Sequence, residues 1–101
     1  MDNFFSPKQT KPLLIERWHS PRGVALLEKL HAGHFSKHVM DGCIEKPFGH
    51  YDLRGIDLTN AQMEGLDLSG IDFFGADFSR ANLSKCDFTD SWLSESVIKG
   101  G

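Results

Sequence analysis

Residues 51–100 repeat with a period of five, and this period limits the folds open to the chain. The ten blocks read YDLRG, IDLTN, AQMEG, LDLSG, IDFFG, ADFSR, ANLSK, CDFTD, SWLSE and SVIKG. The third residue of every block is large and apolar: Leu53, Leu58, Met63, Leu68, Phe73, Phe78, Leu83, Phe88, Leu93 and Ile98. A step of five residues turns a helical side chain by about 140°, and on a strand an odd step flips it to the opposite face. We therefore expect a backbone that turns a corner once per block and points each third residue inward.

The blocks ADFSR at 76–80 and ANLSK at 81–85 resemble the A-(D/N)-L-x-x signature of pentapeptide-repeat proteins. The resemblance extends over 51–100, about half of the chain. It implies a mainly β fold: a right-handed quadrilateral parallel β-helix of about two and a half coils, with a short α-helical N-terminal cap. With four blocks per coil, positions twenty residues apart would stack.

We expect two parts. Residues 1–50 would hold a tail, two short helices and a connector that cap the β-helix, and residues 51–101 would form the pentapeptide-repeat β-helix. Thr10 and Ser20 are typical helix N-caps, each with a proline in the turn that follows, and Gly33 is placed to end the second helix. The tail residues Phe4 and Phe5 could be mobile or could pack on a hydrophobic wall, and both readings stay open.

Charge is divided unevenly between these parts. Residues 1–50 carry seven basic and five acidic side chains, a net of +2, whereas residues 51–101 carry four and nine, a net of −5. The acidic repeat argues against direct nucleic-acid binding. Two cysteines are too few for a disulfide framework, and no apolar run has the length of a membrane span. We expect a soluble, cytoplasmic protein that binds no membrane.

Two groups of residues could suggest chemistry. His31, His34, His38 and Cys43 are possible zinc ligands, but Gly33 interrupts the helix that would bring them together, so we expect no metal and no cofactor. Asp52, Asp57, Asp67, Asp72, Asp77 and Asp87 share the second position of their blocks. This regularity favours a structural role, in which each carboxylate accepts a backbone N–H at the next corner, and an acidic surface. No nucleophile stands with a base, so we expect no catalytic residues and no enzyme.

The exceptions to the repeat are the candidate contact residues. Phe74 replaces the usual polar fourth residue and Trp92 the usual polar second one, and the twenty-residue rule places both on the wall begun by Tyr51. They could bind a partner, or the N-terminal region could cover them. At the unfinished end of the repeat, Leu83, Phe88, Leu93 and Ile98 would also be available for contact.

The sequence thus predicts a non-enzymatic interaction or scaffold module that presents a rigid acidic surface with an aromatic patch to a protein partner or to a second copy. A homodimer through the unfinished end or through the Phe74/Trp92 wall is one expectation, since some members of the resembling family dimerise through that end. The resemblance also implies an alternative, a DNA mimic that modulates a type II topoisomerase such as DNA gyrase.

Overall fold

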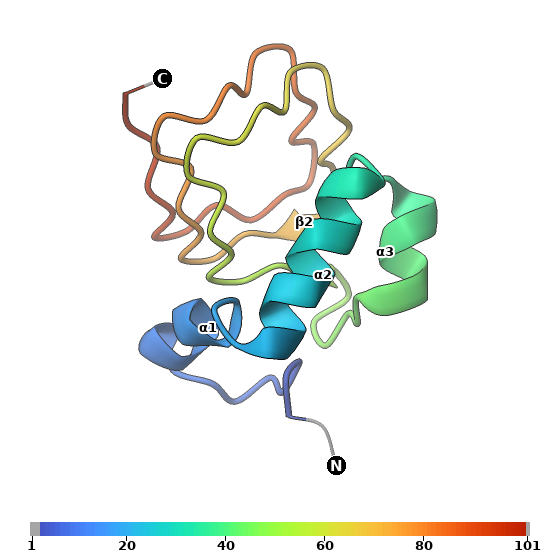
Figure 1. Ribbon diagram of the computed structural model, residues 1–101, viewed down its shortest axis with the longest axis vertical. Helices are drawn as coiled ribbons and strands as arrows, with labels where there is room; N and C mark the ends of the chain where they lie inside the picture. Colours follow the sequence, from blue (N-terminus) through green and yellow to red (C-terminus); the bar gives the residue numbers. More distant parts are fainter. Residues whose placement is uncertain (1–2, 101) are drawn as a thin grey trace.

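A computed structural model describes residues 3–100 (Figure 1). Three helices come first, α1 (Lys11–Arg17), α2 (Pro21–Ala32) and α3 (Lys37–Cys43), and two short strands follow, β1 (Tyr51–Asp52) and β2 (Ile71–Asp72). None of the helices in this described part is long and apolar enough to cross a membrane.

The first two helices begin where the sequence predicts. Thr10 is the N-cap of α1, and the Ser20 hydroxyl accepts the Gly23 N–H at 3.1 Å at the start of α2. Gly33 ends α2 as expected. A tight corner joins α1 to α2, because a Cβ on Gly23 would lie 2.1 Å from the carbonyl oxygen of Arg17. Only glycine can fill that position without moving the backbone.

The third helix corrects the prediction of a connector over 34–50. The Ser36 hydroxyl accepts the Val39 N–H at 3.3 Å, and Met40 anchors α3 in the core. His34 and Phe35 take left-handed backbone angles, with φ of 55° and 54°, and this turn reverses the chain between α2 and α3. A helix of only seven residues has little propensity of its own, so packing of Met40 and of the neighbouring Phe35 decides its formation.

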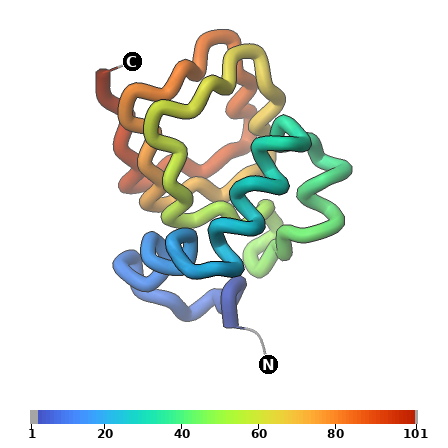
Figure 2. The backbone as a smooth tube through the Cα atoms, viewed as in Figure 1, coloured from blue at the N-terminus to red at the C-terminus, as the bar shows by residue number. Residues whose placement is uncertain are grey.

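The repeat region, residues 51–100, winds so that positions twenty residues apart lie in register. β1 pairs in parallel with β2, with Tyr51 beside Ile71. Isolated parallel bridges continue this spacing at Asp57 with Asp77, Gln62 with Asn82, Asp67 with Asp87, Asp72 with Trp92 and Asp77 with Val97. We call 51–70 the first layer, 71–90 the second and 91–100 the third. Figure 2 shows these layers lying behind one another, with the helices along one side.

The predicted fold class, a mainly β protein built as a right-handed quadrilateral parallel β-helix, is wrong for the described residues. Their only sheet has two strands of two residues each, whereas the helices have seven, twelve and seven residues. The reason is the block length. Turns occupy the fourth and fifth residues of nearly every block, so the extended segment is too short to form a regular strand.

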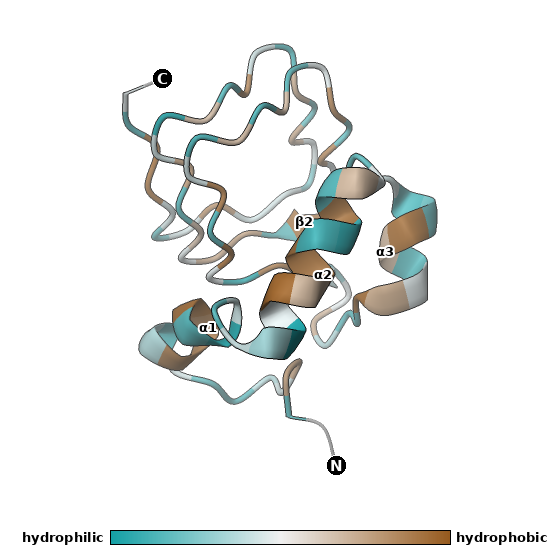
Figure 3. Ribbon diagram, viewed as in Figure 1, coloured by the Kyte–Doolittle hydropathy of each residue, from teal (hydrophilic) through white to brown (hydrophobic). Residues whose placement is uncertain are grey.

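The hydrophobic core runs through both halves of the chain. One cluster joins the third residues of the first two layers to Trp18, Leu30, Phe35 and Met40 of the N-terminal half. Along the repeat, apolar and polar segments alternate (Figure 3), as expected when each block turns one large side chain inward. Whether 1–50 and 51–101 are separate domains stays a prediction.

The tail residues Phe4 and Phe5 are buried in this core. The Phe4 ring meets the Trp18 ring edge to face, with centroids 5.1 Å apart. Of the two readings of the tail, the structure therefore supports packing on a hydrophobic wall.

Candidate binding pocket on the first wall

Residues 51–55, 71–75 and 91–95 form one side of the repeat region, which we call the first wall. The Gly55 N–H donates to the Phe74 carbonyl at 2.7 Å, and the Gly75 N–H donates to the Ser94 carbonyl at 3.0 Å. Phe74 and Trp92 belong to blocks that begin twenty residues apart, and these bonds bring both residues onto the same wall.

A buried group of charges fastens α1 and the tail to the first wall. Arg17 donates two hydrogen bonds to the Asp52 carboxylate, at 2.7 and 3.1 Å. Arg54 donates two more, each at 2.8 Å. Both arginines also donate to backbone carbonyls: Arg17 to those of Phe4 and Arg54, and Arg54 to that of Ser6. Asp52 therefore accepts hydrogen bonds from two guanidinium groups at once, although the buried Arg17 Nε has no partner among the described residues.

These contacts set the proton affinity of Asp52. Burial by itself would raise the pKa of this carboxyl, but the hydrogen bonds from Arg54 and Arg17 outweigh burial and hold the pKa below its ordinary value. Asp52 thus stays ionised, which the two arginines require.

The helix α1 lies directly on the first wall. A Cβ on Gly55 would lie 2.6 Å from the carbonyl carbon of Leu14, so the backbones meet with no room for a side chain. At the other end of the wall, Lys11 pairs with Glu95 at 3.1 Å, with both groups exposed. The N-terminal region therefore covers one part of the wall and leaves the rest open.

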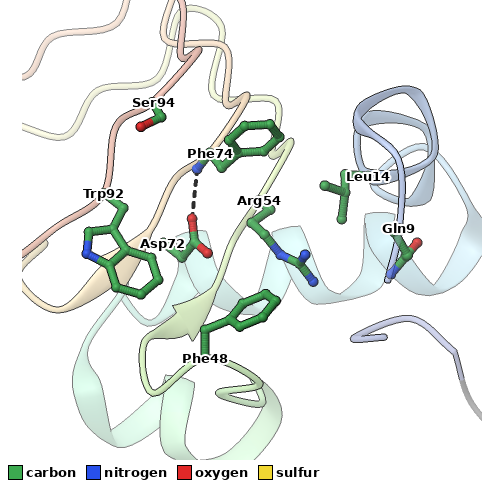
Figure 4. A pocket seen from close by; sticks show the side chains of 8 residues that line it. All are labelled: Gln9, Leu14, Phe48, Arg54, Asp72, Phe74, Trp92 and Ser94. Carbon is green, nitrogen blue, oxygen red and sulfur yellow. Dashed lines mark hydrogen bonds between the residues drawn. The ribbon is translucent and has the colours of Figure 1, made fainter. Parts of the chain in front are cut away.

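The open part is a pocket of about 390 Å³ (Figure 4). Phe48, Phe74 and Trp92 supply three aromatic rings, and Asp72, Arg54 and Leu14 also line it. In Figure 4 the three rings lie around the Asp72 carboxylate, with Arg54 and Leu14 to one side. We call this site the aromatic pocket.

Asp72 is the charged group of this pocket that forms no ion pair among the described residues, although the charges of Arg54 and His50 act on it. Its Oδ1 accepts the Phe74 N–H at 3.0 Å, whereas its Oδ2 accepts no hydrogen bond from the described residues. The side chain is nonetheless buried, with the residue only 4% exposed. Burial raises the pKa of Asp72 above its ordinary value, although the Phe74 N–H and Arg54 oppose this.

Trp92 is held by His50. Their rings stack with centroids 3.7 Å apart, and Trp92 remains 40% exposed. Neither ring nitrogen of His50 has a hydrogen-bond partner among residues 3–100, although His50 Nε2 lies 3.4 Å from Asp90 Oδ2. Phe48, on the other side of the pocket, is 48% exposed and lies 5.2 Å from the Arg54 guanidinium carbon, measured to its ring centre.

The predicted acidic surface needs a correction at two positions. Asp52 and Asp72 are buried under α1 and the pocket rings, so they add no charge to the surface. The other four aspartates, Asp57, Asp67, Asp77 and Asp87, are exposed or half-buried, and each Oδ1 accepts the N–H two residues on, at 2.9 to 3.1 Å. This is the corner-stabilising bond that the sequence predicts.

The unfinished end of the repeat is open in the structure. Leu83, Phe88 and Leu93 are half-buried, and Ile98 is 58% exposed. In the lower layers the third and fifth N–H of each block donate to the next layer. In the three blocks from 81 to 95, the N–H groups of the third and fifth residues have no backbone acceptor within 3–100. These residues are Leu83, Lys85, Phe88, Asp90, Leu93 and Glu95.

The possible zinc ligands do not come together. His31 lies near the end of α2, His34 in the turn after it, and His38 and Cys43 on α3. Within the described range, no three His, Cys, Asp or Glu side chains form a group that could hold a metal ion.

Sequence reasoning missed Arg17, Arg54, Phe48 and His50. Arg17 and Arg54 occupy positions where a charged side chain is common. Nothing in the sequence around them indicates that both will be buried and paired with Asp52. Phe48 and His50 lie in the presumed connector, where an aromatic next to the repeat was the only signal.

One comparison with known proteins bears on the repeat. Residues 52–90 match the family model for pentapeptide repeats in eight copies. Among curated proteins, nothing matches the chain.

Proposed function

The chain belongs to the pentapeptide-repeat family, and from this premise we propose that it is a non-enzymatic module that binds a protein partner through the aromatic pocket of its first wall. Proteins of this repeat class generally serve as interaction or structural modules. The observation that carries the proposal is the gathering of Phe48, Phe74 and Trp92 around one pocket, with Phe48 48% and Trp92 40% exposed.

Aromatic side chains of this kind are where binding energy concentrates. Residues that dominate protein interfaces are enriched in aromatics seated in well-packed pockets with a polar rim. Here Gly55 packs on α1 and His50 stacks on Trp92, so the pocket is already shaped before a partner arrives. A preformed pocket lowers the entropy lost on binding.

The experiment that tests this proposal is site-specific photo-crosslinking. A benzophenone amino acid replaces Phe48 in one variant and Leu13, an exposed residue of α1 outside the pocket, in a control. We expect a discrete crosslinked product in extracts of the source cells from the Phe48 position only. Excess unlabelled wild-type protein should compete with it, whereas excess Trp92→Ser protein should not. Equal crosslinking from both positions would contradict the proposal.

The partner could also be a second copy, through the open end of the repeat. The unpaired N–H groups of Leu83, Phe88 and Leu93 support this proposal, because exposed backbone donors favour pairing with another chain. Light scattering at tens of micromolar protein should then give twice the monomer mass, and Ile98→Lys should lower it. A monomer at that concentration would contradict a homodimer.

The DNA-mimic alternative has less support. Asp57 above Asp77 and Asp67 above Asp87 do form an ordered pair of acidic columns. Burial of Asp52 and Asp72 removes two charges from the series that would imitate phosphates. A supercoiling assay with DNA gyrase tests it, and no inhibition at micromolar protein would dispose of it.

A further inference from the structure

The strongest unexplained feature of the aromatic pocket is its unpaired carboxylate. We propose that the pocket binds a cationic side chain of the partner, an arginine or lysine, whose N–H groups donate to Asp72 Oδ2 while its charge lies against the rings of Phe48, Phe74 and Trp92. This inference rests on the proposed function and names the chemical group that the pocket recognises.

The first step concerns the free acceptor. Asp72 is only 4% exposed, yet Oδ2 accepts no hydrogen bond within the described part of the chain. Oδ2 keeps a small opening to the pocket, unlike the fully buried unpaired nitrogens of Arg17 and His50, so it is a poorly hydrated carboxylate oxygen within reach of a guest. A donor that enters the pocket would supply the hydrogen bond that this charged acceptor lacks.

The second step excludes an internal partner. Arg54 lines the same pocket, but its donors already serve Asp52, at 2.8 Å from both Nε and Nη2, and the backbone carbonyls of Ser6 and Pro7. Arg17 is likewise hydrogen-bonded to Asp52. His50, the other basic side chain whose charge acts on Asp72, donates no hydrogen bond to it, since neither of its ring nitrogens has a partner among residues 3–100. The formal charges of the two arginines cancel those of Asp52 and Asp72, so the two arginines leave no excess positive charge to repel a guest.

The third step concerns the type of guest. An anion would be repelled by Asp72, and an apolar side chain would leave Oδ2 buried without a partner. A cation satisfies the carboxylate and is also attracted to the faces of aromatic rings. Three rings and one carboxylate around a single cavity therefore fit a cationic guest best.

The variant that isolates the carboxylate is Asp72→Asn. Asn82 occupies the equivalent block position and its Oδ1 accepts the Ser84 N–H at 3.1 Å, so an amide fits this corner of the repeat. The variant therefore keeps the bond to the Phe74 N–H, while it removes the charge and replaces the acceptor Oδ2 by an N–H donor. Asp87→Asn makes the same change on an exposed wall and is the matched control.

The test uses four small probes, n-butylguanidinium, n-butylammonium, tetramethylammonium and neutral n-butylurea, in titrations followed by two-dimensional ¹H–¹⁵N NMR of the full chain. We expect saturable shifts of the Trp92 indole N–H and the Phe74 amide with n-butylguanidinium, n-butylammonium or both, which distinguishes an arginine from a lysine guest. The buried Trp18 indole N–H, which donates to the Arg54 carbonyl at 2.8 Å, should not move. Asp72→Asn should weaken binding at least about tenfold, the loss expected for one charge-assisted hydrogen bond, and Asp87→Asn should not.

Tetramethylammonium, which has no N–H, should bind more weakly than the alkyl cations. Four results would overturn the inference: no saturable shift with either alkyl cation, equal binding of n-butylurea, equal binding of tetramethylammonium, or equal binding to Asp72→Asn. Failure here, together with site-specific crosslinking from Phe48, would leave the interaction module standing with another kind of guest. Loss of both would remove the pocket as a binding site.

Discussion

Arg17 and Asp52, thirty-five residues apart, form a two-point ion pair in which both side chains are buried, with Nη2 2.7 Å from Oδ1 and Nη1 3.1 Å from Oδ2. This pair joins α1 to the first layer, and Arg54 completes it from the same block as Asp52. Other polar contacts that hold the tail and α1 over the first wall include the Trp18 indole N–H to the Arg54 carbonyl, Arg54 to the Ser6 carbonyl, and the exposed Lys11–Glu95 pair.

Asp52→Asn should therefore destabilise the protein strongly. Neutralising Asp52 leaves two buried arginines without their carboxylate, and breaking a buried pair in this way costs about 3–5 kcal/mol. Urea denaturation followed by tryptophan fluorescence measures the change in free energy of unfolding. Asp87→Asn, at the same block position but exposed, is the control and should change it little. A loss below about 1 kcal/mol for Asp52→Asn would contradict the role of the pair.

The contribution of Asp52 should disappear in acid. Its pKa in the folded protein lies below the ordinary value, so the ionised form favours folding. That stability is fully present above the ordinary pKa of aspartate, about 3.9, and is lost as the pH falls through the lower folded value. The difference in unfolding free energy between wild type and Asp52→Asn should thus be constant near neutral pH and shrink below about pH 4. A difference that stays constant into strong acid would argue against this assignment.

In contrast to that of Asp52, the ionised carboxylate of Asp72 should lower the free energy of unfolding. Burial raises its pKa, so the folded protein holds the proton more tightly than the unfolded chain, and the ionised form opposes folding. Asp72→Asn should unfold at equal or higher urea concentration than wild type at neutral pH. This gain should vanish once the pH falls below the ordinary aspartate pKa, where both states of the wild type are protonated. Destabilisation at neutral pH would show that the charge of Asp72 has a partner within the protein.

Tyr51 offers a direct spectroscopic check, because it is the only tyrosine of the chain. Its hydroxyl donates to Asp41 Oδ1, and this bond, with burial and the charge of Asp41, raises the pKa of Tyr51 to about 12. Ultraviolet titration of tyrosinate should therefore show an alkaline transition near that value. Asp41→Ala should move it toward the ordinary value of about 10. Asp57→Ala, elsewhere in the first layer, should leave it unchanged.

The sequence was informative where structure depends on spacing and uninformative where it depends on distant contacts. The twenty-residue register follows from the block length, so the pairing of Asp72 with Trp92 could be predicted. The burial of Asp52 could not, because Asp52 and the exposed Asp87 hold the same block position and differ only in what packs above them. That difference comes from Arg17 and α1, which lie far away in the sequence. Likewise α3 depends on the tertiary packing of Met40, and the strands are shorter than the family resemblance implied.

Gly55 and Gly65 provide a matched test of how α1 rests on the first wall. Both occupy the last position of a block in the first layer with left-handed backbone angles, φ of +73° and +76°, so alanine at either position costs about 1–2 kcal/mol in backbone strain. A Cβ at Gly65 would meet nothing within 4 Å, whereas one at Gly55 would lie 2.6 Å from the Leu14 carbonyl carbon and 2.7 Å from the Ile15 nitrogen. Gly55→Ala should therefore cost about 1–3 kcal/mol more than Gly65→Ala, because α1 must move away. Urea denaturation measures the difference, and faster amide exchange in α1 of Gly55→Ala alone would show where it arises. Equal losses would mean that α1 does not pack on Gly55 in solution.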